Sequence, residues 1–136
     1  MRAFVRGPLR FVLLLACLSV SSGAALAHHS DAMFDTSATS KVTGTVAKLE
    51  WMNPHAFLWV YVPSRNKPGT YDLWGFENGS PSVLQGHGWT KEVLKPGDKI
   101  EIEYWPLRDG TIGGHCEKVT FTDGRALQCP SDLGRR

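Results

Sequence analysis

The stretch Lys99-Ile100-Glu101-Ile102-Glu103-Tyr104 decides the fold class of this chain. Its apolar side chains alternate strictly with charged ones, and successive side chains of a β-strand point to opposite faces of a sheet. The pattern therefore predicts a strand with one face in the core and one face in water. Pro96-Gly97-Asp98 supplies a tight turn before it, so we expect the strand over residues 99–107.

The segments on both sides of this strand repeat the β pattern. Asn53-Pro54 and residues 63–70 have the composition of turns, as do Asp109-Gly110 and Asp123-Gly124. Between these turns, β-branched and aromatic residues predict further strands at residues 41–51, 56–62, 71–77, 115–122 and 125–127.

One helical insertion interrupts the strands. Ser80-Pro81 fits a helix N-cap followed by proline at the first helical position, and residues 82–85 are the expected helix, which Gly86 ends. Five or six short strands with a helix between the third and the fourth fit a small OB-like barrel. A small β-sandwich is the alternative, because periodicity does not distinguish a barrel from a sandwich.

Residues 1–27 carry the three parts of a secretory signal peptide. A start with three arginines and no acid precedes the apolar run 11–20, and Ala25-Leu26-Ala27 offers small residues for cleavage. The run is shorter than the ~20 residues that a membrane-spanning helix needs, so a membrane anchor is the weaker interpretation. We expect export to the periplasm with cleavage after Ala27, and lipidation at Cys17 is the alternative.

Cleavage after Ala27 would leave one domain of 109 residues, with an arm at 28–40, a barrel at 41–129 and a loose tail at 130–136. Losing three arginines and no acid changes the formal net charge from +2 to −1. A near-neutral domain lacks the basic stripe of nucleic-acid-binding proteins, so we expect no nucleic-acid partner. No other apolar run is long enough for a membrane span.

Cys116 and Cys129 are the two cysteines that remain after processing. An even pair in an oxidising compartment predicts a disulfide. In the chain-entropy model, closing a loop of this size stabilises a fold by about 3 kcal/mol. Two free thiols or two metal ligands are the alternatives.

Short motifs along nearly the whole expected mature domain resemble, in this order, the small exported bacterial proteins of DUF6152, a domain of unknown function. The motifs are His28-His29-Ser30, Met33-Phe34-Asp35, Gly44-Thr45-Val46, Trp51-Met52-Asn53-Pro54-His55, Gly79-Ser80-Pro81, Gly88-Trp89-Thr90, Leu94-Lys95-Pro96-Gly97-Asp98, Pro106-Leu107-Arg108-Asp109-Gly110 and Gly113-Gly114. The resemblance implies export and a small β fold, and it implies no activity. His115-Cys116 and Cys129 depart from the family pattern, so the disulfide and any role for His115 belong to this chain alone.

All five histidines follow the expected cleavage site, and His28 would become the first residue. A terminal histidine offers its ring and an α-amine of pKa about 7.7–8.0, whose proton a metal displaces near neutrality. Such nitrogen donors suit Cu(II), so copper is the ligand that we expect at His28, with His29 or His55 completing the site. The alternative is a solvated start at His28 and His29, with His55 capping a turn.

Trp51, Asn53 and Trp89 are the candidates for a ligand surface. Asn53 lies between two expected strands, at a barrel end where binding loops gather. Of the five tryptophans, Trp51 and Trp89 stand at element ends and are expected to be the most exposed. The alternatives are structural, a turn at Asn53 and tryptophans that fill the core.

The sequence gives little support for catalysis. Glu77 and Asp72 are expected to be isolated acids on a strand, and no nucleophile-elbow motif is present. We therefore expect a periplasmic binding or accessory module rather than an enzyme, with copper as the leading ligand. A module that presents a barrel face or edge strand to an exported protein is the alternative, and a hydrolase is a distant third.

Overall fold

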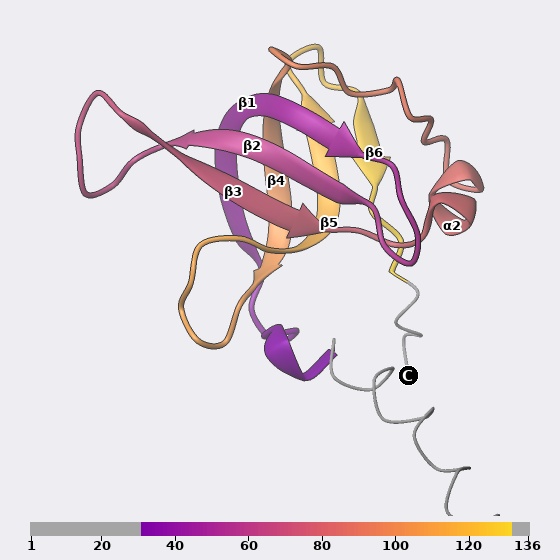
Figure 1. Ribbon diagram of the computed structural model, residues 1–136, viewed down its shortest axis with the longest axis horizontal. Coiled ribbons are helices and arrows are strands. Elements are labelled where there is room, and N and C mark those ends of the chain that lie inside the picture. Colours follow the sequence, from indigo (N-terminus) through magenta and orange to yellow (C-terminus); the bar gives the residue numbers. More distant parts are fainter. Residues whose placement is uncertain (1–30, 132–136) are drawn as a thin grey trace, which may run out of the picture. The chain divides into compact units, whose positions relative to one another are not determined.

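The computed structural model of the chain describes residues 31–131 (Figure 1). The expected signal peptide and most of the expected tail lie outside the described residues. Within them, the elements in chain order are the 3-10 helix η1 (Asp31–Met33), β1 (Ser40–Glu50), β2 (Phe57–Pro63), β3 (Tyr71–Glu77), α2 (Pro81–Gln85), β4 (Lys99–Pro106), β5 (Gly114–Phe121) and β6 (Ala126–Gln128).

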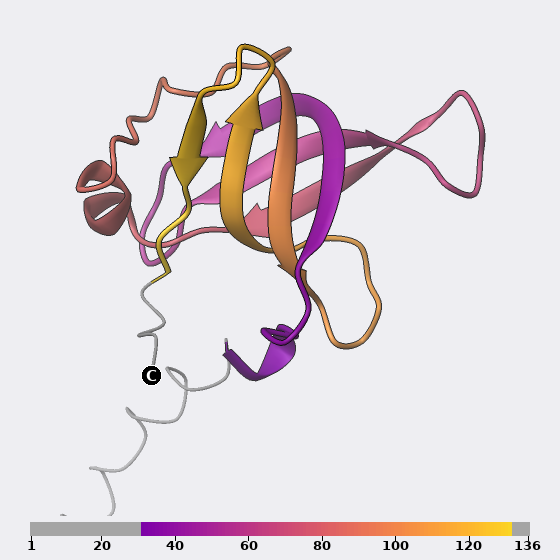
Figure 2. The ribbon, with the colours of Figure 1, turned by 180° about the vertical axis from the view of Figure 1, so that it is seen from behind.

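The strands form one sheet that closes on itself. Its order is β3-β2-β1-β4-β5-β6, and each neighbouring pair is antiparallel. A short parallel pairing of β3 with β5, Phe76 with Gly114 and Glu77 with His115, closes five strands into a barrel. Strand β6 extends the sheet beside β5, and α2 follows β3 outside the barrel (Figures 1 and 2). This arrangement confirms the OB-like barrel with one helical insertion and excludes the sandwich.

Strand β1 bends so that it pairs with β4 along its first half and with β2 along its second half. Residues 40–45 pair with β4, and residues 45–50 pair with β2. Gly44 lies at the bend, where a Cβ atom would stand only 2.5 Å from Cγ1 of Val60. The strands approach there more closely than any side chain permits, so this position requires glycine.

The alternation that predicts β4 is also its burial pattern. Ile100, Ile102 and Tyr104 are buried in the barrel, whereas Lys99, Glu101 and Glu103 face outward. Inward-facing residues of the other strands complete the core, among them Val46, Leu58, Val60, Phe76, Cys116 and Val119. Burying such apolar side chains supplies the main stabilisation of a small barrel.

The described part of the N-terminal arm packs on the connection between β4 and β5. Phe34 is buried and forms a β-bridge with Leu107. Asp35 N–H donates to the Pro106 carbonyl over 2.8 Å, and Arg108 Nε donates to the Phe34 carbonyl over 2.9 Å. The arm is thus held by its backbone as well as by one aromatic side chain.

Candidate functional site

His55 lies in the short loop that joins β1 to β2. The loop is fixed at its far end, because Ala56 is buried and its N–H donates to the Gly79 carbonyl over 3.1 Å. Asn78 N–H in turn donates to the Ala56 carbonyl over 2.9 Å. These bonds extend the β2–β3 pairing by a step and hold His55 beside the end of β3.

Glu77, the last residue of β3, orients the imidazole of His55. His55 Nδ1 lies 2.9 Å from Glu77 Oε1 and 3.2 Å from the Asn78 carbonyl oxygen. Both neighbours are acceptors, so the tautomer that satisfies them carries its proton on Nδ1. The two side chains are 24% and 13% exposed. Both polar contacts of this ring with the described residues use Nδ1, which leaves the lone pair of Nε2 for a ligand.

The N-terminal arm reaches the barrel next to this pair. Glu77 is the register partner of His115 on β5. The buried His115 ring stacks on Trp105 with ring centroids 5.2 Å apart, and Phe34 meets it edge-on at 5.5 Å. The described arm therefore packs on the strand β5 that pairs with β3 at Glu77. The predicted ligands His28 and His29 lie outside the described residues.

The predicted ligand surface is only partly exposed. Asn53 is exposed, and the peptide between it and Pro54 is cis. Trp51 is half-buried and packs against the core. Met52 between them is 52% exposed. The expectation that Trp89 is a surface residue is wrong, since only 1% of it is exposed.

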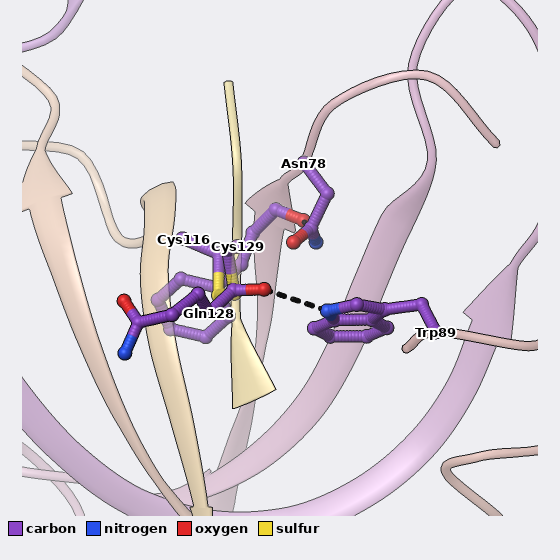
Figure 3. The surroundings of a disulfide bond; sticks show 6 residues. Asn78, Trp89, Cys116, Gln128 and Cys129 are labelled. Carbon is purple, nitrogen blue, oxygen red and sulfur yellow. Dashed lines mark hydrogen bonds between the residues drawn. A yellow bond between two sulfur atoms is a disulfide. The ribbon is translucent and has the colours of Figure 1, made fainter. Parts of the chain in front are cut away.

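Trp89 is instead part of a closed structural corner (Figure 3). Its Nε1 donates to the Gln128 carbonyl over 2.7 Å, beside the disulfide that joins Cys116 to Cys129. Both cysteines are buried. The predicted disulfide is confirmed, and neither sulfur is a free thiol or a metal ligand. An element end in the sequence does not reveal such burial, because the segments that cover Trp89 are distant along the chain.

A second surface lies on the outer face of the β2–β3 hairpin. Tyr61 and Leu73 are register partners, Tyr71 lies near them, and all three are exposed. The hairpin connection carries Arg65 and Lys67, both exposed. Within residues 31–131 neither cation forms an ion pair. The face is therefore apolar along its strands and basic at its tip.

Charged clusters elsewhere are structural. Glu103 accepts from Lys118 over 2.5 Å and from Lys41 over 2.9 Å, and these contacts, Lys118 first, lower the pKa of its carboxyl. The described part of the chain contains no group of three histidines, cysteines or acids placed to hold a metal. His55 with Glu77 thus offers one oriented ligand, not a complete metal centre.

A family model matches most of the chain. Residues 14–117 match the family of unknown function DUF6152. The chain belongs to this family. In this DUF6152 chain the matched range contains both His55 and Glu77, whereas Cys129 lies beyond it. Comparisons with curated proteins and with solved structures find no match. Within residues 31–131 no helix has the length and apolar character to cross a membrane.

Glu77 is the site residue that sequence reasoning missed. The expectation of an isolated acid is wrong, because Glu77 pairs with His55. The hairpin register contains the missing signal: β2 and β3 pair from Pro63 opposite Tyr71 to Phe57 opposite Glu77. Glu77 lies opposite Phe57, which follows His55 by two residues. His55 and Glu77 are therefore diagonal neighbours on the same face.

Proposed function

We propose that this DUF6152 chain is an exported copper-binding module in which His55 is the preorganised ligand. The observation that carries the proposal is the 2.9 Å contact between Glu77 Oε1 and His55 Nδ1, which leaves Nε2 for the metal. Metal-binding histidines commonly donate their second ring N–H to a carboxylate, which fixes the tautomer and strengthens the ligand. The acid on β3 performs that function for His55.

The remaining donors come from the expected mature N-terminus. His28 offers an amine and a ring, and His29 offers a second ring. The described arm that follows them packs Phe34 on His115, the register partner of Glu77. We infer that one Cu(II) takes nitrogen donors of His28 and His29 together with Nε2 of His55, a donor set that suits this ion.

Copper titration of the mature protein tests the proposal. Protein that starts at His28 should bind one Cu(II), and binding should weaken as pH falls and the amine and imidazoles take up protons. One extra residue before His28, or His55→Ala, should each lower the affinity at least about tenfold, as even loss of an outer-shell partner does. Glu77→Gln should lower it by roughly 10–100-fold.

His87→Ala is the matched control, since His87 is an exposed histidine whose Nδ1 contacts the Val83 carbonyl in the turn after α2. Its copper affinity should equal that of the unaltered protein. Equal affinities of the mature and extended proteins would show that the amine is not a ligand. An unchanged affinity of His55→Ala would overturn the role of the barrel in the site.

The outer face of the β2–β3 hairpin favours a second candidate function, docking of an exported protein. Tyr71 is 63% exposed, and large apolar side chains on a protruding surface are typical of interaction sites. Arg65 and Lys67 at the tip complement an acidic partner. We infer that the hairpin receives an acidic extended segment of a partner protein.

A photo-crosslinking residue at Tyr71 tests this second function in cells. It should give one discrete adduct that disappears when Arg65→Ser and Lys67→Ser are combined. The same residue at Glu92, which is exposed on the connection after α2, should give none. Equal labelling from both positions, or an adduct insensitive to the two substitutions, would contradict docking at the hairpin.

A further inference from the structure

Met52 places an exposed thioether in the loop that carries His55. Methionine is among the residue types most often fully buried, yet 52% of Met52 is exposed. It lies in the loop between β1 and β2, three residues before His55. A thioether and an imidazole with an available Nε2 thus share one short loop at the barrel end.

The loop is fixed at both ends, which limits how far apart Met52 and His55 lie. Trp51 packs against the core before Met52, and Ala56 is buried after His55. Three peptide units separate the Cα atoms of Met52 and His55 by at most about 11 Å. Methionine has three rotatable side-chain bonds, so Sδ can turn to an ion held by the oriented imidazole.

Thioether sulfur is a soft ligand that favours Cu(I) over divalent ions. We propose that Met52 Sδ and His55 Nε2 together form a site for a soft monovalent cation, Cu(I), at this loop. The inference rests on the ligand role of His55 in the proposed function and adds a second oxidation state, Cu(I), to the Cu(II) proposed there. It needs neither the α-amine nor the ring of His28, and it involves no electron transfer, because the ion binds as Cu(I).

Silver titration of the mature protein tests the inference, with Ag(I) as a redox-inert probe for Cu(I). Met52→Leu keeps the size of the side chain and removes the sulfur. It should lower Ag(I) affinity at least about tenfold, the scale of losing an outer-shell partner, and leave Cu(II) affinity unchanged. Met33→Leu is the matched control, because Met33 is also exposed but lies in η1. Its Ag(I) affinity should equal that of the unaltered protein.

The variants separate this inference from the proposed function. The protein with one extra residue before His28 should bind Ag(I) normally while losing Cu(II) affinity. Undiminished Cu(II) affinity in that protein would show that the amine is not a ligand. The Met52 and His55 site would still be supported if Met52→Leu binds Ag(I) more weakly. Unchanged Ag(I) affinity in Met52→Leu, or an equal loss in Met33→Leu, would overturn the soft site. Unchanged Ag(I) affinity in His55→Ala would also overturn it.

Discussion

Two corners of the barrel contain cysteine or histidine, and they differ in whether the sulfur or ring nitrogen atoms of these residues already have partners. In the first corner, Cys116 and Cys129 are bonded to each other, and the indole of Trp89 donates to Gln128. In the second, the polar contacts of His55 with residues 31–131 use only Nδ1. Buried polar groups are normally satisfied within a fold. Residue type therefore does not distinguish a structural corner from a binding site, whereas the bonds that the cysteine sulfurs and the histidine nitrogens already form do.

Asn78 lies between the two corners. Its carbonyl oxygen is 3.2 Å from His55 Nδ1, and its side chain lies beside the disulfide (Figure 3). The residue is fully buried. Asn78 thus connects the two corners, which are nevertheless expected to respond to substitution in opposite ways.

The largest effect is expected at the closed corner. Trp89→Ala removes a fully buried indole and its hydrogen bond, and should lower the free energy of unfolding by about 3–5 kcal/mol. Denaturant unfolding followed by circular dichroism measures this loss. A loss below about 1 kcal/mol would show that the corner is not the structural one, since that is the scale of a surface change.

The disulfide should give the next largest effect. Converting Cys116 and Cys129 together to alanine should cost about 3 kcal/mol in the free energy of unfolding, because the cross-link restricts the unfolded chain. Thiol counting on denatured, unreduced mature protein should find neither cysteine free. Two reactive thiols would contradict the bridge.

The corner formed by His55 and Glu77 should show the reverse pattern, with a small effect on stability and a large effect on copper binding. His55→Ala removes a partly buried hydrogen bond to Glu77, and a single hydrogen bond contributes a net of about 0.5–1.5 kcal/mol to stability. Denaturant unfolding should therefore change little while copper affinity falls. A stability loss as large as that of Trp89→Ala, with copper affinity unchanged, would make His55 a structural residue.

The smallest effect concerns pH and a third region, the outer face of β4. The contacts of Glu103 with Lys118 and Lys41 lower the pKa of its carboxyl in the folded chain. Their contribution is present above the unfolded pKa of about 4.3 and is lost as pH falls through the lower folded value. Glu103→Gln should reduce the loss of stability in acid, as denaturant unfolding at pH 7 and pH 3 would show. An identical acid response would assign the pH dependence to other carboxyls.

Much of the fold follows from local patterns. The alternation in residues 99–104 and the turn signals around the strands contain the periodicity that becomes the sheet. The bend of β1 does not follow from them, because it depends on the approach of Val60 to Gly44 from another strand. The burial of Trp89 could not be predicted for the same reason, since its hydrogen-bond partner Gln128 lies far along the chain.

The candidate residue His55 could be singled out from the sequence, but its pairing with Glu77 could not. The loop position of His55 is visible in the sequence, as is the pair of cysteines. The role of Glu77 depends on the exact β2–β3 register, and a shift by one residue would turn its side chain to the other face. Periodicity alone does not fix that register, so the pair emerges only from the fold.

We propose that Glu77 holds His55 with its proton on Nδ1 and with Nε2 open to a metal. Nitrogen NMR of the His55 ring, on mature protein before and after one equivalent of Ag(I), tests it most directly. We expect a protonated Nδ1 throughout and a shift of Nε2 alone when silver binds. A proton on Nε2 in the metal-free protein, or an Nε2 signal that stays unchanged while silver is bound, would contradict it.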